Sequence, residues 1–190
     1  MCYMVKCTYV TPHELNIDYQ HLMIRYRKLQ NSKNELNAIP KELAKIDRNA
    51  KVAGIAPSIA NWGSSRNNKI SRILMEKTIG IDKQVELPKF AKKTFIRLSK
   101  DEKMLPNNTA PGFGKKVALF ATCYVNYNNT EVGVAAQKVL LNNGIEVKPV
   151  YPGCCGMPFL EQAELDKVKS QSEIVSDELC KYIDEGYDIV

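Results

Sequence analysis

The pattern of apolar residues alternates between continuous runs and helical spacing over the last third of the chain. Residues 117–122 form an unbroken run, Val-Ala-Leu-Phe-Ala-Thr, which is typical of a strand buried on both faces. Over residues 130–143 the apolar side chains recur on one helical face. Residues 145–150 predict a second short strand, and residues 165–183 predict a long second helix. This order of strand, helix, strand and helix indicates parallel strands joined by right-handed crossovers, so we expect an α/β fold.

Cysteines occupy the turns that follow both predicted strands. Cys123 ends the first strand, and the triplet Cys154-Cys155-Gly156 follows the second one. Because the carboxyl ends of parallel strands meet at one edge of a sheet, where open α/β folds bind ligands, we expect the three thiols to converge there. Adjacent cysteines close a disulfide with each other only in strained geometry, whereas grouped thiolates suit an iron–sulfur cluster or zinc. The alternative is a pair of small apolar side chains in a tight loop.

The last residues predict a third strand. Asp188-Ile189-Val190 turns apolar and β-branched after Gly186, which is expected to end the long helix. Soft-metal sites usually have four ligands, and this sheet edge supplies three. We therefore expect the fourth ligand just beyond residue 190, in a chain that is truncated at its C-terminus.

The N-terminal segment carries a second pair of cysteines. Cys2 and Cys7 are separated by four residues, which is typical of the end of a ferredoxin-type cysteine run whose first members are missing. The alternative is two unremarkable thiols near a chain end. For His13 and His21, hydrogen bonds that fix this loop onto the next helix are expected in preference to metal ligation. Cys180, inside the long C-terminal helix, is expected to be a core thiol.

The central part of the chain is less informative. Residues 18–30 predict a helix capped by Asp18, and residues 71–77 predict another that ends near Gly80. Basic residues between 89 and 100 are expected to lie on a solvated helical face. Residues 104–114 are rich in proline, glycine and asparagine and mark a domain boundary.

Taken together, these motifs resemble the CCG-domain iron–sulfur oxidoreductase subunits. That family includes the C subunit of anaerobic glycerol-3-phosphate dehydrogenase and heterodisulfide-reductase-like proteins. The resemblance covers nearly the whole chain, through the following motifs: Pro12-His13-Glu14, Ile17-Asp18, His21-Leu22-Met23, Arg25-Tyr26-Arg27, Leu87-Pro88-Lys89, Thr94-Phe95, Cys123 to Asn128 and Cys154 to Pro158.

The resemblance implies a domain organisation. Residues 1–34 would be the remnant of a ferredoxin-like cluster domain, residues 35–103 a helical linker region, and residues 115–190 the first half of a CCG domain with a partial parallel βαβα order. In the family, upstream cysteines complete two cubane clusters, and a further cysteine completes the first CCG motif. This chain has none of these, so we expect a fragment truncated at both ends.

The implied function is electron transfer. Clusters of the 4Fe–4S type would relay electrons between a flavin-bearing dehydrogenase subunit and a quinone or another acceptor. The ligands implied by the resemblance are Cys2, Cys7, Cys123, Cys154 and Cys155. No acid–base pair or nucleophilic triad is visible, so we expect no substrate chemistry from this chain itself. The competing interpretation is a zinc-binding structural module, or a thiol-redox module, without electron transfer.

Composition bears on the compartment and the partners. Six cysteines without a signal peptide favour a reducing, cytoplasmic location and metal ligation in place of disulfides. No apolar run approaches the ~20 residues of a membrane span. The formal net charge of +6 is compatible with an acidic partner or with peripheral association on the inner face of the cell membrane. We expect no nucleic-acid partner.

Overall fold

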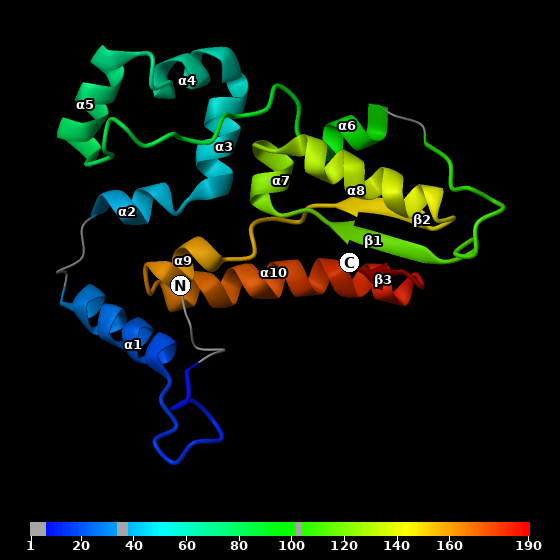
Figure 1. The fold of residues 1–190 in the computed structure, drawn as a ribbon, viewed down its shortest axis with the longest axis horizontal. Helices are drawn as coiled ribbons and strands as arrows, with labels where there is room; N and C mark the ends of the chain where they lie inside the picture. Colours follow the sequence, from blue (N-terminus) through cyan, green and yellow to red (C-terminus); the bar gives the residue numbers. More distant parts are fainter. Residues whose placement is uncertain (1–6, 34–37, 102–103) are drawn as a thin grey trace.

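The computed structural model describes residues 7–33, 38–101 and 104–190, which form a helical first half and an α/β second half (Figure 1). The helices of the first half are α1 (Tyr19–Ser32), α2 (Ala38–Leu43), α3 (Ile46–Ile55), α4 (Pro57–Ser64), α5 (Lys69–Ile79) and α6 (Phe95–Asp101). The second half contains β1 (Lys116–Phe120), α7 (Cys123–Tyr127), α8 (Thr130–Asn142), β2 (Glu146–Val150), α9 (Met157–Glu161), α10 (Leu165–Asp184) and β3 (Asp188–Ile189). The predicted α/β class is confirmed.

The sheet is parallel, with the strand order β2-β1-β3. In its register, Val117 of β1 stands opposite Val147 of β2 and opposite Asp188 of β3. The first crossover moves from β1 outward to β2, and the second moves back past β1 to β3. Right-handed crossovers that run in opposite directions place their helices on opposite faces, and α8 and α10 indeed flank the sheet from two sides (Figure 1).

The third strand is short but paired beyond its assigned ends. The Val190 N–H donates to the carbonyl of Ala118 at 3.1 Å, and the Phe120 N–H donates to the carbonyl of Val190 at 2.7 Å. The strand predicted at residues 188–190 therefore forms as an edge of the sheet. This pairing leaves β1 in the centre, which explains its continuous apolar sequence.

The core joins the two halves through Phe95. This ring, at the start of α6, is fully buried. It packs against α8 where Gly133 has no side chain: a Cβ at that position would lie 2.6 Å from the ring. The α6–α8 contact therefore depends on a glycine that lets a helix backbone approach an aromatic ring closely.

Local sequence signals explain several helix ends. Asp18 caps α1 by accepting the His21 N–H at 3.2 Å, and Gly80 ends α5 in a left-handed conformation. Both features were predicted. The helices α2, α3, α4 and α6 were not predicted individually, because each is too short to show a clear apolar period. Pro57 stands at the start of α4 and separates it from α3.

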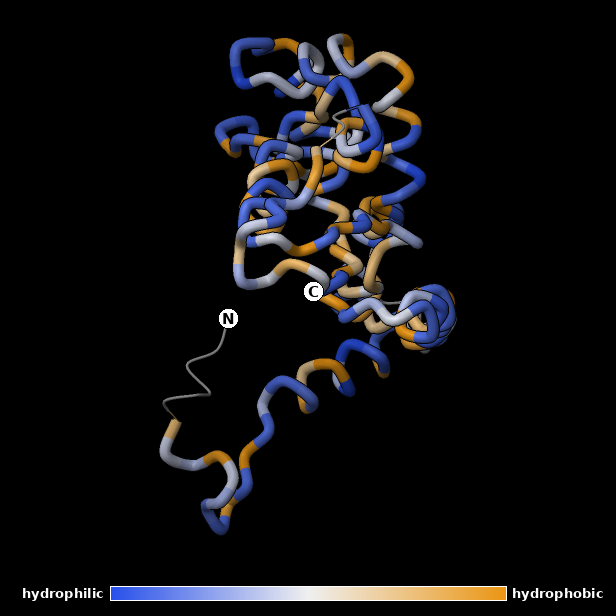
Figure 2. The backbone as a smooth tube through the Cα atoms, turned by 90° about the vertical axis from the view of Figure 1, so that its right-hand side faces the viewer, coloured by the Kyte–Doolittle hydropathy of each residue, from blue (hydrophilic) through white to orange (hydrophobic). Residues whose placement is uncertain are grey.

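The segment of residues 7–32 extends away from the rest of the molecule (Figure 2). Its contacts with the second half include a hydrogen bond at 2.9 Å from the Arg27 guanidinium to the carbonyl of Glu161. Lys28 also approaches Asp166, with 3.9 Å between nitrogen and oxygen. No helix in the described ranges combines the length and the apolar character that crossing a membrane would require.

Candidate functional site

Cys123 lies at the carboxyl end of β1, where the chain enters a short helix. Thr122 caps α7 by accepting the Val125 N–H at 3.2 Å, so Cys123 is the first helical residue. The sequence predicted a turn here, and the cap explains why that turn becomes helical. The Cys123 side chain is half-buried.

The CCG triplet forms the corresponding turn after β2. Cys154 is buried, whereas Cys155 is exposed. Gly156 has φ +90° and precedes the first residue of α9. An L-residue with a side chain is strained in this left-handed conformation, so the turn requires glycine at that position. Backbone geometry therefore explains why the third residue of the motif is glycine. The two cysteines before it are explained by the thiols that the turn presents at the sheet edge.

Cys123 and Cys154 influence each other's ionisation at the sheet edge. The Cys154 thiol stabilises the Cys123 thiolate as a hydrogen-bond donor, which lowers the pKa of Cys123 to about 7. The same hydrogen bond, together with burial, raises the pKa of Cys154. The adjacent strands β1 and β2 thus bring together two sulfurs that are 31 residues apart in sequence.

A carboxylate from the helical half reaches the same turn. Asp47, in the first turn of α3, accepts the Cys154 backbone N–H through Oδ2 at 3.0 Å. Its other oxygen, Oδ1, accepts the Tyr151 hydroxyl at 2.5 Å. The rings of Tyr127 and Tyr151 meet edge to face, with 5.5 Å between centroids. Burial raises the pKa of Tyr127 to about 12, and that of Tyr151 rises through burial and the bond to Asp47.

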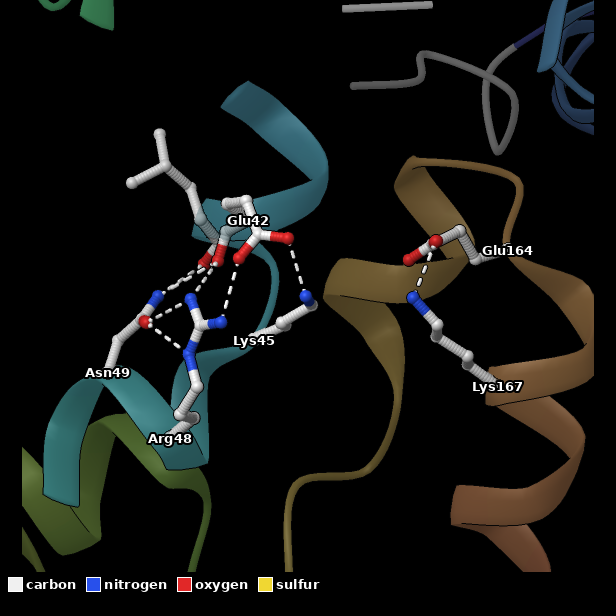
Figure 3. Close-up of polar contacts among 7 residues, drawn as sticks. Glu42, Lys45, Arg48, Asn49, Glu164 and Lys167 are labelled. Carbon is white, nitrogen blue, oxygen red and sulfur yellow. Dashed lines mark hydrogen bonds and ion pairs between the residues drawn. The ribbon is translucent and has the colours of Figure 1, made fainter. Parts of the chain in front are cut away.

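The corner between α2 and α3 is itself held by polar contacts (Figure 3). The Glu42 carboxylate accepts from Lys45 at 2.5 Å and from Arg48 at 2.7 Å. Asn49 donates to the main-chain carbonyl of Glu42 at 3.0 Å. These bonds fix the first turn of α3, from which Asp47 extends.

The remaining predicted ligands are not placed at this edge. Cys2 lies outside the described residues, and Cys7 lies in the segment before α1. His13 and His21 make local contacts: the Leu15 N–H donates to His13 Nδ1 at 3.1 Å, and His21 pairs with Asp18. The prediction that Cys180 is a core thiol is wrong, because its side chain is exposed on α10. Helical spacing alone could not tell which face of α10 meets the sheet.

The sulfur donors of the sheet edge match the preferences of a soft metal or cluster only in part. Two thiols at one sheet edge and a third on the neighbouring residue form the soft, sulfur-rich set that iron–sulfur clusters and zinc prefer. Within the described ranges, however, no three histidine, cysteine, aspartate or glutamate side chains are grouped closely enough to hold a metal ion. The chemistry of the site fits such a group, while a complete ligand set is not formed by these residues.

Sequence reasoning missed Asp47, Tyr127 and Tyr151 at this site. Tyr127 and Tyr151 flank the two cysteine turns, but no motif connected either of them with Asp47. Asp47 is 107 residues from Cys154, in a region whose helices gave weak signals. Only the fold brings this carboxylate to the turn.

Comparison with known proteins agrees with the geometry. A family model described as "CCG: Cysteine-rich domain" matches residues 117–190. The C subunit of the anaerobic glycerol-3-phosphate dehydrogenase of Escherichia coli (strain K12) is 30% identical over 102 residues, which are 53% of this chain and 25% of that protein. The B subunit of the fumarate reductase (CoM/CoB) of Methanothermobacter marburgensis is 35% identical over 78 residues, which are 40% of this chain and 15% of that protein.

The matched regions therefore span a quarter or less of the length of these curated relatives. No solved structure matches the chain. The family match begins in β1 and includes all three cysteines of the sheet edge. Residues 117–190 therefore match the CCG cysteine-rich domain, and the chain is similar over 53% of its length to the C subunit of anaerobic glycerol-3-phosphate dehydrogenase.

Proposed function

We propose that this protein is an iron–sulfur electron-transfer subunit of an oxidoreductase complex. The observation that carries the proposal is the placement of Cys123 and Cys154 in the turns that follow the paired parallel strands β1 and β2, at one carboxyl edge of the sheet. Open α/β folds bind their ligands at that edge. Thiols that the fold already gathers at one edge need little rearrangement before both sulfurs can bind one cluster.

In this proposal Cys123, Cys154 and Cys155 are cluster ligands. A bound 4Fe–4S cluster would supply one-electron transfer, and such clusters are held by four thiolates. The sheet edge supplies three, so the remaining ligand is a group that the described residues do not include. Cys2 and Cys7 are assigned to a second cluster in residues 1–34. Residues 35–103 link it to the domain at residues 115–190.

The partner proposed is a flavin-bearing dehydrogenase subunit, with a quinone or another acceptor receiving the electrons. The two relatives are named as subunits of a dehydrogenase and of a reductase. The helix α1 offers a surface for such assembly, because Tyr19, Leu22, Tyr26 and Leu29 recur at helical spacing and are each more than half exposed. An unpartnered apolar stripe of this kind often marks a protein interface. A cytoplasmic site of action and peripheral membrane association belong to the same proposal.

A zinc-binding or thiol-redox module is the second candidate. The specific observation in its favour is that Cys123 and Cys154 influence each other's ionisation at the same sheet edge, because two such thiols could bind zinc or act as a redox pair without a cluster. The two candidates differ in colour, metal content and spectroscopic signature.

The test is anaerobic purification of the full chain, followed by metal analysis, visible absorption and electron paramagnetic resonance. Electron transfer predicts a brown protein with iron and sulfide, and a paramagnetic signal on reduction. Cys123→Ala and Cys154→Ala should each lose the part of this absorption that comes from the sheet-edge cluster. The matched control is Cys180→Ala, an exposed cysteine on α10, which should keep it.

Two results would contradict the proposal. A colourless protein that contains zinc after anaerobic reconstitution with iron and sulfide would support the second candidate. Equal cluster content in Cys123→Ala and in the unaltered protein would show that the sheet edge is not the cluster site.

A further inference from the structure

We infer that Asp47 is a positioning residue of the cysteine site, and that the helical half of the chain is therefore part of that site. Asp47 would not bind the metal. It would hold the turn that carries Cys154 in place at the sheet edge that it shares with Cys123. The effect on metal binding rests on the proposed function, whereas the effect on the turn does not.

The geometry uses both oxygens of the carboxylate. Oδ2 accepts the Cys154 N–H at 3.0 Å, and Oδ1 accepts the Tyr151 hydroxyl at 2.5 Å. Tyr151 directly precedes the turn Pro152-Gly153 that leads to Cys154. One side chain thus fixes the turn at two points. Hydrogen bonds to an ionised acceptor are stronger than neutral ones, so this clamp is stiffer than a main-chain contact.

The turn has few other ways to satisfy its main chain. Gly153 and Cys154 are both buried, and a buried N–H needs a partner because water cannot replace it. The turn is also packed tightly from α10: a Cβ at Gly153 would lie 2.7 Å from the Gln171 side chain and 3.6 Å from Asp47 Oδ2. The chain at Gly153 is thus enclosed between α3 and α10, with Asp47 as the polar contact on the α3 side.

Asp47 can act as a clamp because its own helix is anchored. The bonds among Glu42, Lys45, Arg48 and Asn49 fix the α2–α3 corner (Figure 3). The same half of the chain also holds α7, which begins at Cys123. The Ala91 N–H donates to the carbonyl of Tyr127 at 2.8 Å, and the Asn128 amide donates to the carbonyl of Lys89 at 2.9 Å. Both cysteine turns are thus attached to residues that precede the CCG domain.

A simpler explanation for an aspartate at position 47 is that acidic residues are favoured in the first turn of any helix. Asp166 provides the matched control, because it occupies the first turn of α10 and its one polar partner among the described residues is a distant ion pair with Lys28. Removing either carboxylate takes one charge from a helix N-terminus. Only the Asp47 carboxylate is bonded to the cysteine turn.

The experiment compares the full chain with Asp47→Ala, Asp47→Asn, Tyr151→Phe and Asp166→Ala. The first readout is hydrogen exchange at the Cys154 amide, measured without metal. The second is the affinity for Co²⁺, used as a thiolate-binding probe, measured by its absorption under anaerobic conditions. Circular dichroism establishes that each variant is folded.

We expect Asp47→Ala to accelerate exchange at Cys154 by about tenfold or more, because a hydrogen bond to a charged acceptor is lost. Its Co²⁺ affinity should fall about 10- to 100-fold, as is typical when a residue that orients a ligand is removed. Asp47→Asn keeps one acceptor oxygen and should recover part of both losses, and Tyr151→Phe should give a smaller effect. Asp166→Ala should match the unaltered protein.

Unchanged exchange at Cys154 in a folded Asp47→Ala variant would overturn the inference. Equal losses of exchange protection and Co²⁺ affinity in Asp47→Ala and Asp166→Ala would also overturn the inference. Such losses would follow from removing a charge at a helix N-terminus and not from the contact with the cysteine turn. If Asp47→Ala does not fold, Asp47→Asn and Tyr151→Phe decide by the same readouts. If the unaltered chain does not bind Co²⁺, the proposed metal site is contradicted. The exchange rate at the Cys154 amide still tests whether Asp47 positions the turn.

Discussion

Replacing Gly156 by alanine tests whether the third residue of the CCG triplet is required by the backbone. Gly156 has φ +90°, and a Cβ there would meet its nearest neighbours in α10 at 3.6–3.7 Å, which is ordinary van der Waals contact. The space is therefore sufficient, and the cost arises from the left-handed conformation alone. For a residue with a Cβ that cost is about 1–2 kcal/mol.

Gly186 is the matched control for this substitution. It has φ +82°, and a Cβ at this position would meet nothing within 4 Å, so Gly186→Ala carries the same backbone cost outside the cysteine turns. Both variants should lose about 1–2 kcal/mol of unfolding free energy in urea, which corresponds to ~2–8 °C in Tm for a chain of this size. Only Gly156→Ala should also weaken Co²⁺ binding, because relaxation of φ at Gly156 moves the neighbouring Cys155.

The reasoning would be refuted by either of two results. If Gly156→Ala is as stable as the unaltered protein, the left-handed conformation is not enforced by the fold. If Gly186→Ala weakens Co²⁺ binding as much as Gly156→Ala does, the metal effect follows from general destabilisation and says nothing about the CCG turn.

Further substitutions test the packing and the capping. Gly133→Ala places a Cβ 2.6 Å from the buried Phe95 ring and should cost about 1–3 kcal/mol in urea unfolding; a neutral result would mean that α6 and α8 are not in contact. Gly54→Ala, with open space around a helical glycine, should instead stabilise α3 by about 0.5–1 kcal/mol in the same assay. The hydrogen bond from the His21 N–H lowers the pKa of Asp18. The Asp18 carboxylate therefore caps α1 at neutral pH, and this cap is lost as the pH falls through the lowered pKa. Amide chemical shifts of α1 should report this fraying on acidification, and Asp18→Asn, which caps without titrating, should abolish the pH dependence.

The fold class was accessible from sequence because its signals are local. A central parallel strand is buried on both faces, so β1 shows a continuous apolar run, and the helix α8 shows an apolar face. The positions of Cys123 and Cys154 at the same sheet edge follow from this order, because parallel strands present their carboxyl ends together. Gly156 also follows from a local requirement, the left-handed turn after the two cysteines.

Tertiary structure decided the features that depend on contacts between distant segments. The exposed position of Cys180 depends on which face of α10 meets the sheet, and an apolar period with few strong residues does not fix that face. The mutual effect of Cys123 and Cys154 on each other's pKa and the hydrogen bond from the Cys154 N–H to Asp47 join segments that are 31 and 107 residues apart. Sequence periodicity shows only which residues lie on the same face of one helix or strand. The side chains that meet across elements are selected by packing, and at this sheet edge packing added a carboxylate and two tyrosines to the cysteines.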